Sequence, residues 1–177
     1  MDRWDEYYLG IAEIVSRNSK CYSRRIGAIL VKDKSIISTG YNGPPRGVPH
    51  CGEERVKLDI VLRKWMFGTF EPRLQEDING CPRKAMGFKS GEGLDYCIAA
   101  HAEQNCIANA ARMGIRTLDS TLYMNDQIPC KNCMAILINA GVKEVVVTKL
   151  ELYDGEGEYL AKYGGLKIRT FEGEVWK

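Results

Sequence analysis

The stretch STLYMNDQIPCKNCMAILINAGVKEVVVT, residues 120–148, predicts the architecture of this 177-residue chain. It opens with a strand at Ser120–Met124 and closes with a nearly all-apolar strand at Lys143–Thr148, of the kind that is buried on both faces of a sheet. A helix over Cys130–Ala140, ended by Gly141, connects the two. Because strand–helix–strand connections are right-handed crossovers, we expect the two strands to pair in parallel.

Further elements are expected on either side of this unit. They are an amphipathic helix at 4–17, strands at Gly27–Lys32 and Ser35–Thr39 joined by a turn, a Gly- and Pro-rich loop from Gly40 to Pro49, an Ala-rich helix at Ala100–Met113, a short helix near Glu158–Tyr163 and a last strand at Lys167–Phe171. Together they predict an α/β fold, a three-layer α/β/α sandwich with a mixed sheet of about five strands.

The domain organisation follows from the length of the chain and from one irregular segment. We expect residues 1–177 to form a single domain. Residues 52–96 are rich in Gly, Pro and charge and contain cysteines, so they are interpreted as a loop-rich insertion, in which Val56 to Trp65 is compatible with a helix.

Composition narrows the class of protein. The net charge is only +2, which argues against a nucleic-acid-binding surface, because such surfaces are usually strongly basic. The N-terminus shows no export signal, and no apolar run is long enough to cross a membrane. We therefore expect a cytoplasmic protein, in which seven cysteines favour metal binding over disulfides.

The motif His101-Ala-Glu103, followed by Pro129-Cys130-Lys-Asn-Cys133, carries the chemistry. One imidazole and two thiolates are ligands that tetrahedral zinc favours, and three protein ligands leave the fourth position open, as in catalytic sites. Cys130 and Cys133 are spaced i, i+3 at a helix start, where the helix dipole favours thiolates. This spacing is the signature of zinc-dependent base deaminases.

Glu103 is predicted to move protons rather than to bind the metal. It lies too close in sequence to His101 to be an easy second ligand. Its carboxylate would pass a proton from the attacking water to ring nitrogen N3 and then to the departing amine. Two other interpretations are less consistent with the pattern. A structural zinc site would normally have four protein ligands, and a redox pair of Cys130 and Cys133 leaves the His-x-Glu unexplained.

Four stretches carry a family resemblance: Cys21-Tyr-Ser-Arg-Arg-Ile-Gly-Ala-Ile-Leu-Val, Thr39-Gly-Tyr-Asn-Gly-Pro-Pro-Arg-Gly-Val-Pro-His-Cys51, His101-Ala-Glu-Gln-Asn105 and Ala140-Gly-Val-Lys-Glu-Val. With them the chain resembles the cytidine deaminase superfamily, and within it the deoxycytidylate deaminases. The resemblance implies zinc-dependent hydrolysis of dCMP to dUMP and ammonia, which feeds thymidylate synthesis. It also implies a homo-oligomer, often a hexamer, that is activated by dCTP and inhibited by dTTP with Mg²⁺.

The resemblance also implies roles for individual residues. Glu103 is the proton shuttle, and His101, Cys130 and Cys133 hold the catalytic zinc. Substrate contacts are expected from Asn42, Asn105, Arg112 and Tyr153, although Arg112 also fits a solvated surface residue and Tyr153 a packing residue. The effector nucleotide is expected at Asn42, Gly43 and Arg46, in a loop whose Gly and Pro residues also fit simple turns.

A second, structural zinc is expected from the remaining cysteines. Some phage-type members of the family bind one through the positions of Cys21 and Cys51. Here Cys81 and Cys97 would complete the set, with His50 as a substitute ligand, and would pin the insertion to the core. The alternative is that some of these are buried free cysteines that pack as small hydrophobes. Cys106 is expected in the core.

Other functions use the same residues. One alternative is a deaminase of dCTP or of a modified dCMP. Another is a deaminase of a base in RNA or DNA, and this second alternative requires a basic, aromatic-lined groove. A different class is a catalytically silent zinc module that senses a nucleotide. The intact His101 and Glu103 argue against the last.

Overall fold

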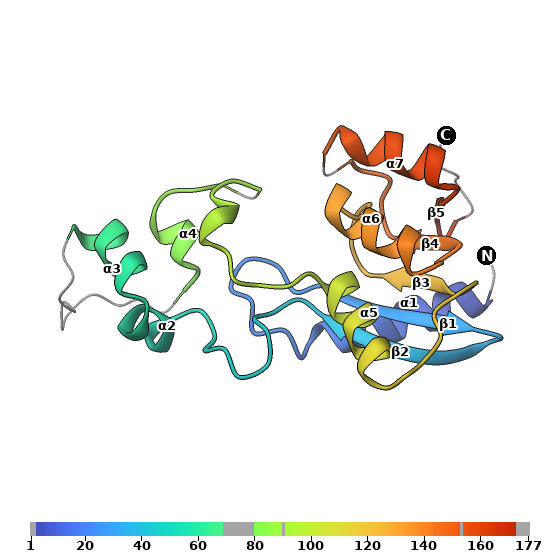
Figure 1. The fold of residues 1–177 in the computed structure, drawn as a ribbon, viewed down its shortest axis with the longest axis horizontal. Coiled ribbons are helices and arrows are strands. Elements are labelled where there is room, and N and C mark those ends of the chain that lie inside the picture. Colours follow the sequence, from blue (N-terminus) through green and yellow to red (C-terminus); the bar gives the residue numbers. More distant parts are fainter. Residues whose placement is uncertain (1–2, 69–79, 90, 153, 173–177) are drawn as a thin grey trace. The chain divides into compact units, whose positions relative to one another are not determined.

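The computed structural model describes residues 3–68, 80–89, 91–152 and 154–172 (Figure 1). They fall into two compact units. The sheet unit comprises the described parts of residues 1–19, 26–42 and 101–177, and the insert unit comprises those of 20–25 and 43–100. The number of domains stays a prediction. Among the helices described, none combines the length and the apolar character that a membrane span requires.

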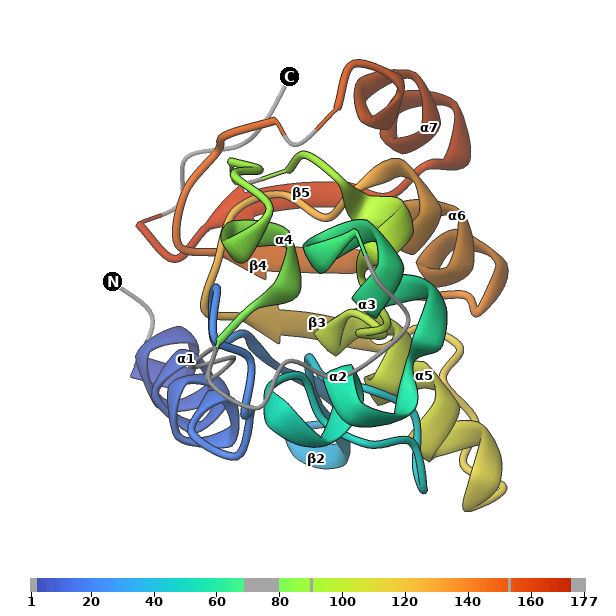
Figure 2. The same cartoon turned by 90° about the vertical axis from the view of Figure 1, so that its left-hand side faces the viewer.

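The sheet unit is built on five strands, in the order β2-β1-β3-β4-β5. The strands are β1 (Gly27–Lys32), β2 (Ser35–Tyr41), β3 (Thr121–Met124), β4 (Glu144–Val147) and β5 (Lys167–Thr170). β1 pairs antiparallel with β2 and with β3, whereas β3–β4 and β4–β5 are parallel. Figure 2 shows β3, β4 and β5 lying side by side in this order. The expected parallel pair and the mixed five-stranded sheet are confirmed.

Helices cover both faces of this sheet. On one face α1 (Arg3–Ser16) buries Tyr8 and Leu9 against Ile29, Tyr123 and Val146. On the other face lie α5 (Ala102–Arg112), α6 (Lys131–Asn139) and α7 (Glu156–Gly164). Alternate residues of a strand point to opposite faces, so neighbours such as Ile29 and Leu30 feed two separate cores. The three-layer α/β/α sandwich is therefore confirmed.

A glycine lets α5 approach the sheet closely. A Cβ atom on Gly40 would lie 2.4 Å from both the Ala102 oxygen and the Cys106 nitrogen of that helix. The prediction that the strand ends at Thr39 was wrong by two residues, because β2 continues through Gly40 to Tyr41. A glycine within a strand often marks such a close backbone approach, and here it holds the first turn of α5 against β2.

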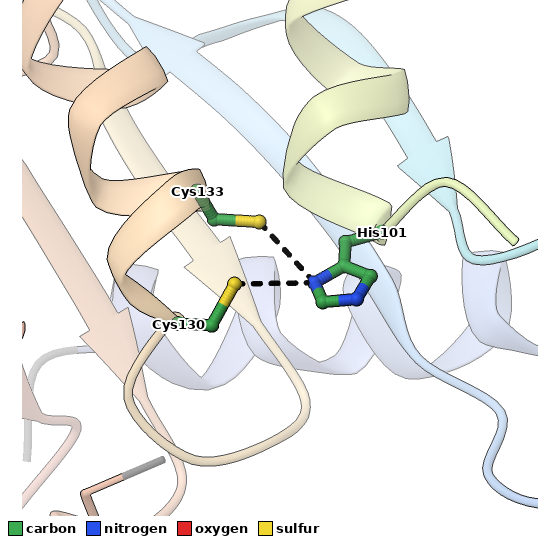
Figure 3. A group of neighbouring side chains, drawn as sticks. All are labelled: His101, Cys130 and Cys133. Atoms are coloured by element: carbon green, nitrogen blue, oxygen red, sulfur yellow. Dashed lines mark hydrogen bonds between the residues drawn. The ribbon is translucent and has the colours of Figure 1, made fainter. Parts of the chain in front are cut away.

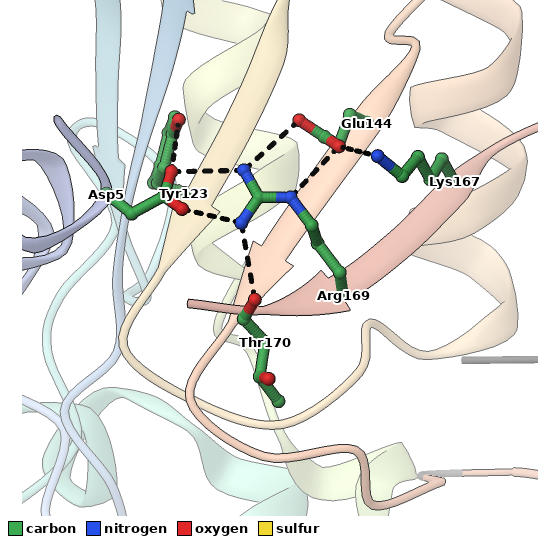
Figure 4. Close-up of polar contacts among 6 residues, drawn as sticks. All are labelled: Asp5, Tyr123, Glu144, Lys167, Arg169 and Thr170. Atoms are coloured by element: carbon green, nitrogen blue, oxygen red, sulfur yellow. Dashed lines mark hydrogen bonds and ion pairs between the residues drawn. The ribbon is translucent and has the colours of Figure 1, made fainter. Parts of the chain in front are cut away.

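A charged network links α1 to the far edge of the sheet (Figure 4). The Arg169 guanidinium on β5 donates to both oxygens of Asp5, at 2.6 and 3.0 Å, and its Nε donates to Glu144 at 3.0 Å. Tyr123 donates to Asp5 at 2.9 Å, and Lys167 pairs with Glu144 at 2.8 Å. The Asp5 side chain is only 4% exposed, so its charge depends on these partners.

The insert unit contains α2 (Glu53–Leu58), α3 (Ile60–Phe67), α4 (Pro82–Ala85) and a 3-10 turn, η1 (Leu94–Tyr96). The expected single helix over 56–65 is instead two helices that meet at Asp59. The backbone of Asp59 is extended, with φ −89° and ψ 90°, and its carboxylate accepts the Leu62 N–H at 2.9 Å. Aspartate favours this role because its side chain caps a helix start better than it continues a helix.

Candidate metal centre

Two helix N-termini in the sheet unit bring three ligand side chains together (Figure 3). His101 is the residue immediately before α5, and Cys130 is the residue immediately before α6. Both have the extended backbone that is usual for a residue at this position, with ψ of 160° and 161°. Cys133 lies in the first turn of α6 and is fully buried. The structure confirms that the two helix starts meet.

The distances fit a tetrahedral metal ion. The Nδ1 atom of His101 lies 3.5 Å from the Cys130 sulfur and 3.3 Å from the Cys133 sulfur. Two ligands at zinc distances of about 2.05 and 2.3 Å are expected about 3.5 Å apart in a tetrahedral site. Among the residues that the structure describes, no other group of three His, Cys, Asp or Glu side chains gathers its ligand atoms this closely.

The two thiols are electrostatically coupled. A hydrogen bond from Cys133, together with the nearby His101, lowers the pKa of Cys130 to about 4. The pKa of Cys133 is raised, because Cys133 donates that hydrogen bond and is buried. Zinc binds cysteines as thiolates, so a divalent cation at this site would take the place of their protons.

Glu103 lies beside this group as a buried carboxyl. It is 4% exposed, and burial raises the pKa of its carboxyl above the ordinary value. The neighbouring His101 and Cys133 lower the pKa of this carboxyl and Cys130 raises it. The Glu103 carboxyl therefore interacts electrostatically with all three ligands. A buried carboxyl with a raised pKa next to a metal centre is suited to exchange protons with a reacting group.

The predicted substrate residues Asn42 and Asn105 have structural partners. The Asn42 side-chain oxygen accepts the Ile26 N–H at 2.9 Å, and its main-chain oxygen accepts the Ser19 hydroxyl at 2.7 Å. Asn105 donates from its amide to the Tyr41 oxygen at 2.8 Å. Both side chains thus hold the end of β2 in place, and their contact with a nucleotide stays a prediction.

Arg112 and Tyr153 are not brought to the metal centre by the described structure. Arg112 is exposed and is the last residue of α5, an 11-residue helix that begins next to His101. At 1.5 Å per residue the two ends lie about 16 Å apart, so this placement does not support a shared substrate contact within one chain. Tyr153 lies outside the described residues.

The loop predicted to bind an effector uses some of its N–H groups for its own structure. Gly43 donates to the Ala100 oxygen at 3.1 Å and accepts from the Ala100 nitrogen at 2.8 Å. Val48 donates to the Pro45 oxygen at 3.0 Å, which closes a turn around the exposed Arg46. A phosphate cradle would therefore have to use other N–H groups of this loop.

The four cysteines predicted to hold a second zinc all lie in the insert unit. Each is partly exposed, and Cys81 and Cys97 both act electrostatically on the Cys51 thiol. Burial raises the pKa of Cys51, although Arg55 donates to its sulfur at 3.5 Å. Cys106 is different, because it is fully buried in the main core, where burial raises its pKa to about 12.

Two features near these sites escaped the sequence interpretation. In the insert unit a cavity of about 520 Å³ is lined by residues 20–25, which include Lys20, Arg24 and Arg25. Three cations within six residues were a visible signal that the low net charge of the whole chain concealed.

The second feature is Asp154 in the sheet unit, whose carboxylate accepts the backbone N–H of Lys131 in the first turn of α6. It left no local signal, since 23 residues separate the partners.

Comparisons with known proteins agree with this site. Residues 2–149 match the family model described as the cytidine and deoxycytidylate deaminase zinc-binding region. The deoxycytidylate deaminase of Mycobacterium phage D29 is 30% identical over 151 residues, covering 82% of this chain and 94% of the phage protein. That of Enterobacteria phage T4 is 32% identical and covers 82% and 77%. That of Schizosaccharomyces pombe is 30% identical over 95% of this chain.

The chain is also similar to solved structures, and some of its relatives are longer proteins of which it covers only a part. The dCMP deaminase of cyanophage S-TIM5, solved in complex with dCMP and dUMP, has a TM-score of 0.65 at 24% identity and shares the fold over 97% of this chain and 98% of that one. The chain spans less than half the length of the S. pombe relative, 44%. On the family match over residues 2–149 and the metal-binding geometry, this chain belongs to the cytidine and deoxycytidylate deaminase zinc-binding family.

Proposed function

We propose that this chain catalyses the hydrolytic deamination of dCMP to dUMP and ammonia at the centre formed by His101, Cys130 and Cys133. One observation carries the proposal: three ligand atoms suited to zinc converge beside the buried carboxyl of Glu103. Relatives that cover most of this chain are named deoxycytidylate deaminases, and the family model spans the whole motif.

The residues divide the chemical work. Zinc held by the three ligands would lower the pKa of water to about 7 and so supply hydroxide at neutral pH. Glu103 takes the proton of the attacking water, gives it to N3 of the pyrimidine and then delivers a proton to the amino group. The oxygen adds to C4, the C4–N bond breaks, and ammonia leaves. Water and dCMP are thereby converted to dUMP and ammonia with atoms and charge balanced.

A monophosphate substrate is supported by the relatives that cover most of this chain, which are named deoxycytidylate deaminases. The alternatives are dCTP, a modified dCMP or a base in nucleic acid. The low net charge of +2 favours a small anionic nucleotide over a polynucleotide.

Regulation and pathway belong to the same proposal. We propose that the product feeds dTTP synthesis, that dCTP activates and dTTP inhibits with Mg²⁺, and that the enzyme acts as a homo-oligomer, up to a hexamer. The support is the resemblance to the deoxycytidylate deaminases in the stretch from Thr39 to Cys51. Asn42, Gly43 and Arg46 are the proposed effector residues, in a cytoplasmic enzyme.

The test is ammonia release by the purified protein from dCMP, deoxycytidine, dCTP, 5-methyl-dCMP and a cytosine-containing oligonucleotide. We expect dCMP to react fastest and deoxycytidine, which lacks the phosphate, to react much more slowly. We also expect dCTP with Mg²⁺ to shift the dCMP saturation curve to lower concentrations and dTTP to shift it back. Faster turnover of another substrate would replace dCMP in the proposal, and an unchanged saturation curve would remove the regulation from it.

We further propose a structural zinc held by Cys21, Cys51, Cys81 and Cys97, with His50 as a substitute ligand. The support is that all four cysteines lie partly exposed in one unit and that three of them are electrostatically coupled. Within the described residues their sulfur atoms do not form a group as tight as the one at His101. Binding would therefore draw them together and stabilise the insert unit.

Metal analysis tests the second zinc. The wild-type protein is expected to hold two zinc ions per chain, and the double variant Cys51→Ser, Cys97→Ser to hold one while it still turns over dCMP. Cys106→Ala is the matched control, since this cysteine is buried in the main core and belongs to neither proposed ligand set, and it should keep both ions. One zinc per wild-type chain would contradict the second site.

A further inference from the structure

Asp154 lies in the segment before α7 and bridges two helix starts in the sheet unit. Its Oδ2 atom accepts the backbone N–H of Lys131 at 2.8 Å, and its Oδ1 atom accepts the N–H of Gly157 at 3.0 Å. Lys131 is the first residue of α6, directly between the ligand Cys130 and the rest of the turn that carries Cys133. One carboxylate therefore joins the start of α7 to the helix turn that bears both thiolates.

The first turn of α6 needs such a partner. The first four N–H groups of a helix lack acceptors within the helix, so helix ends fray unless other groups satisfy them. The Lys131 N–H, the first of the helix, is not capped by the side chain of Cys130 and is satisfied by Asp154. A carboxylate is a favourable acceptor at this end, because it also interacts with the positive end of the helix dipole.

The start of α7, next to Asp154, packs closely against α6. Gly157 packs closely against α6: a Cβ atom there would lie 3.0 Å from the Cε atom of Met134, and at an ordinary contact distance of 3.4 Å from Oδ1 of Asp154. Met134 follows Cys133 on α6 and is fully buried. The glycine thus lets the start of α7 press against the turn of α6 that carries the ligands.

Helical geometry connects this contact to the metal. Cys130 and Cys133 are spaced i, i+3, so their sulfur atoms meet on one side of the helix only while the first turn is formed. In the structure these sulfurs and Nδ1 of His101 all lie within 4.8 Å of one another. Holding the turn in place before the ion arrives removes an ordering cost from metal binding.

We propose that Asp154 is a positioning residue of the metal centre, which acts through the backbone of Lys131 to hold Cys130 and Cys133 in the geometry that binds zinc. The inference rests on the metal centre of the proposed function. Removing a group that supports a metal ligand typically weakens metal affinity by about 10–100-fold. We expect Asp154→Ala to weaken zinc binding to that extent.

The experiment introduces Asp154→Ala and Asp154→Asn into the Cys51→Ser, Cys97→Ser protein, which keeps only the metal centre and serves as the parent. Each variant is compared with this parent by chelator competition for zinc and by the thiolate-to-metal charge-transfer absorption of the Co²⁺-substituted protein, and the control variant is made in the same parent. Asparagine keeps one oxygen acceptor, so Asp154→Asn should recover most of the affinity. The matched control is Asp59→Ala, which removes an aspartate that caps α3 through Leu62, far along the chain from the ligands. It should lower the melting temperature yet leave zinc affinity and the Co²⁺ spectrum unchanged.

The outcomes separate this inference from the proposed function. If Asp154→Ala binds zinc as tightly as the parent with the same Co²⁺ spectrum, the positioning role is overturned while the metal centre stands. If Asp59→Ala loses zinc affinity equally, Asp154 contributes only general stability and the inference also fails. A third outcome is that Asp154→Ala shows the expected loss of zinc affinity, whereas the wild-type protein binds zinc but does not turn over dCMP. This outcome would reject the proposed reaction and leave the positioning role of Asp154 intact.

Discussion

The Glu103→Gln variant is expected to bind zinc normally and to lose about a thousandfold in kcat for dCMP, because positioned acid–base groups contribute about 10²–10⁴-fold. Glutamine keeps the shape of the side chain but cannot carry a proton from water to N3 or to the departing amine. The carboxyl is buried beside the three ligands, so bulk water has little access to replace it. Ammonia release and zinc content, measured on the same preparation, check the prediction.

A control separates loss of the proton carrier from general damage. Glu158→Gln makes the same chemical change at an exposed position of α7 and should keep wild-type kcat. The zinc content of both variants should equal that of wild type. If Glu103→Gln holds its zinc and still keeps more than about a tenth of wild-type kcat, Glu103 is not the main proton carrier.

Arg169→Met is expected to lower the free energy of unfolding by about 3–5 kcal/mol, the usual effect of removing one partner of a buried ion pair. The substitution leaves the Asp5 carboxylate, 4% exposed, without the two hydrogen bonds that the guanidinium supplies (Figure 4). It also removes the 3.0 Å hydrogen bond to Glu144. Denaturant unfolding of the wild type and the variant measures the difference.

Lys167→Met is the matched control, since Lys167 pairs with the same Glu144 but its side chain is 56% exposed. Exposed ion pairs contribute at most about 1 kcal/mol, so this variant should unfold close to wild type. An equal loss of unfolding free energy in the two variants would show that the burial of Asp5 does not determine the size of the effect of Arg169→Met. Such a result would contradict the account of the network.

The same network predicts how stability depends on pH. Burial raises the pKa of Glu144, but hydrogen bonds from Lys167 and Arg169 outweigh it, so the pKa lies below its ordinary value. A carboxyl with a lowered folded-state pKa stabilises the fold above its unfolded pKa of about 4.3 and loses that contribution as the pH falls further. Glu144→Gln should therefore show a shallower loss of stability than wild type below about pH 4.

Much of the fold and of the metal centre could be predicted from local patterns. The apolar strands on either side of the Cys130 helix predicted a parallel pair, and β3 and β4 form it. The motif predicted three ligands, and the structure brings His101, Cys130 and Cys133 together. These predictions hold because strand burial, helix starts and ligand spacing are each encoded within a few neighbouring residues.

Details that depend on distant contacts were predicted less well. The strand end at Tyr41 was missed because Gly40 belongs to a close approach with α5, more than 60 residues further along the chain. The break at Asp59 between α2 and α3 was missed because Asp59 caps the next helix instead of extending the first. In both cases one residue fits two local structures, and packing or capping selects between them.

Local sequence patterns therefore predicted which side chains gather at the metal centre and how the strands of the sheet unit pair. The partners that hold those groups in place come from tertiary contacts alone. Asp154 reaches the first turn of α6 across 23 residues, and Arg169 meets Asp5 across 164. No short-range period or motif relates residues so far apart, because each contact exists only after helices and strands have packed against one another.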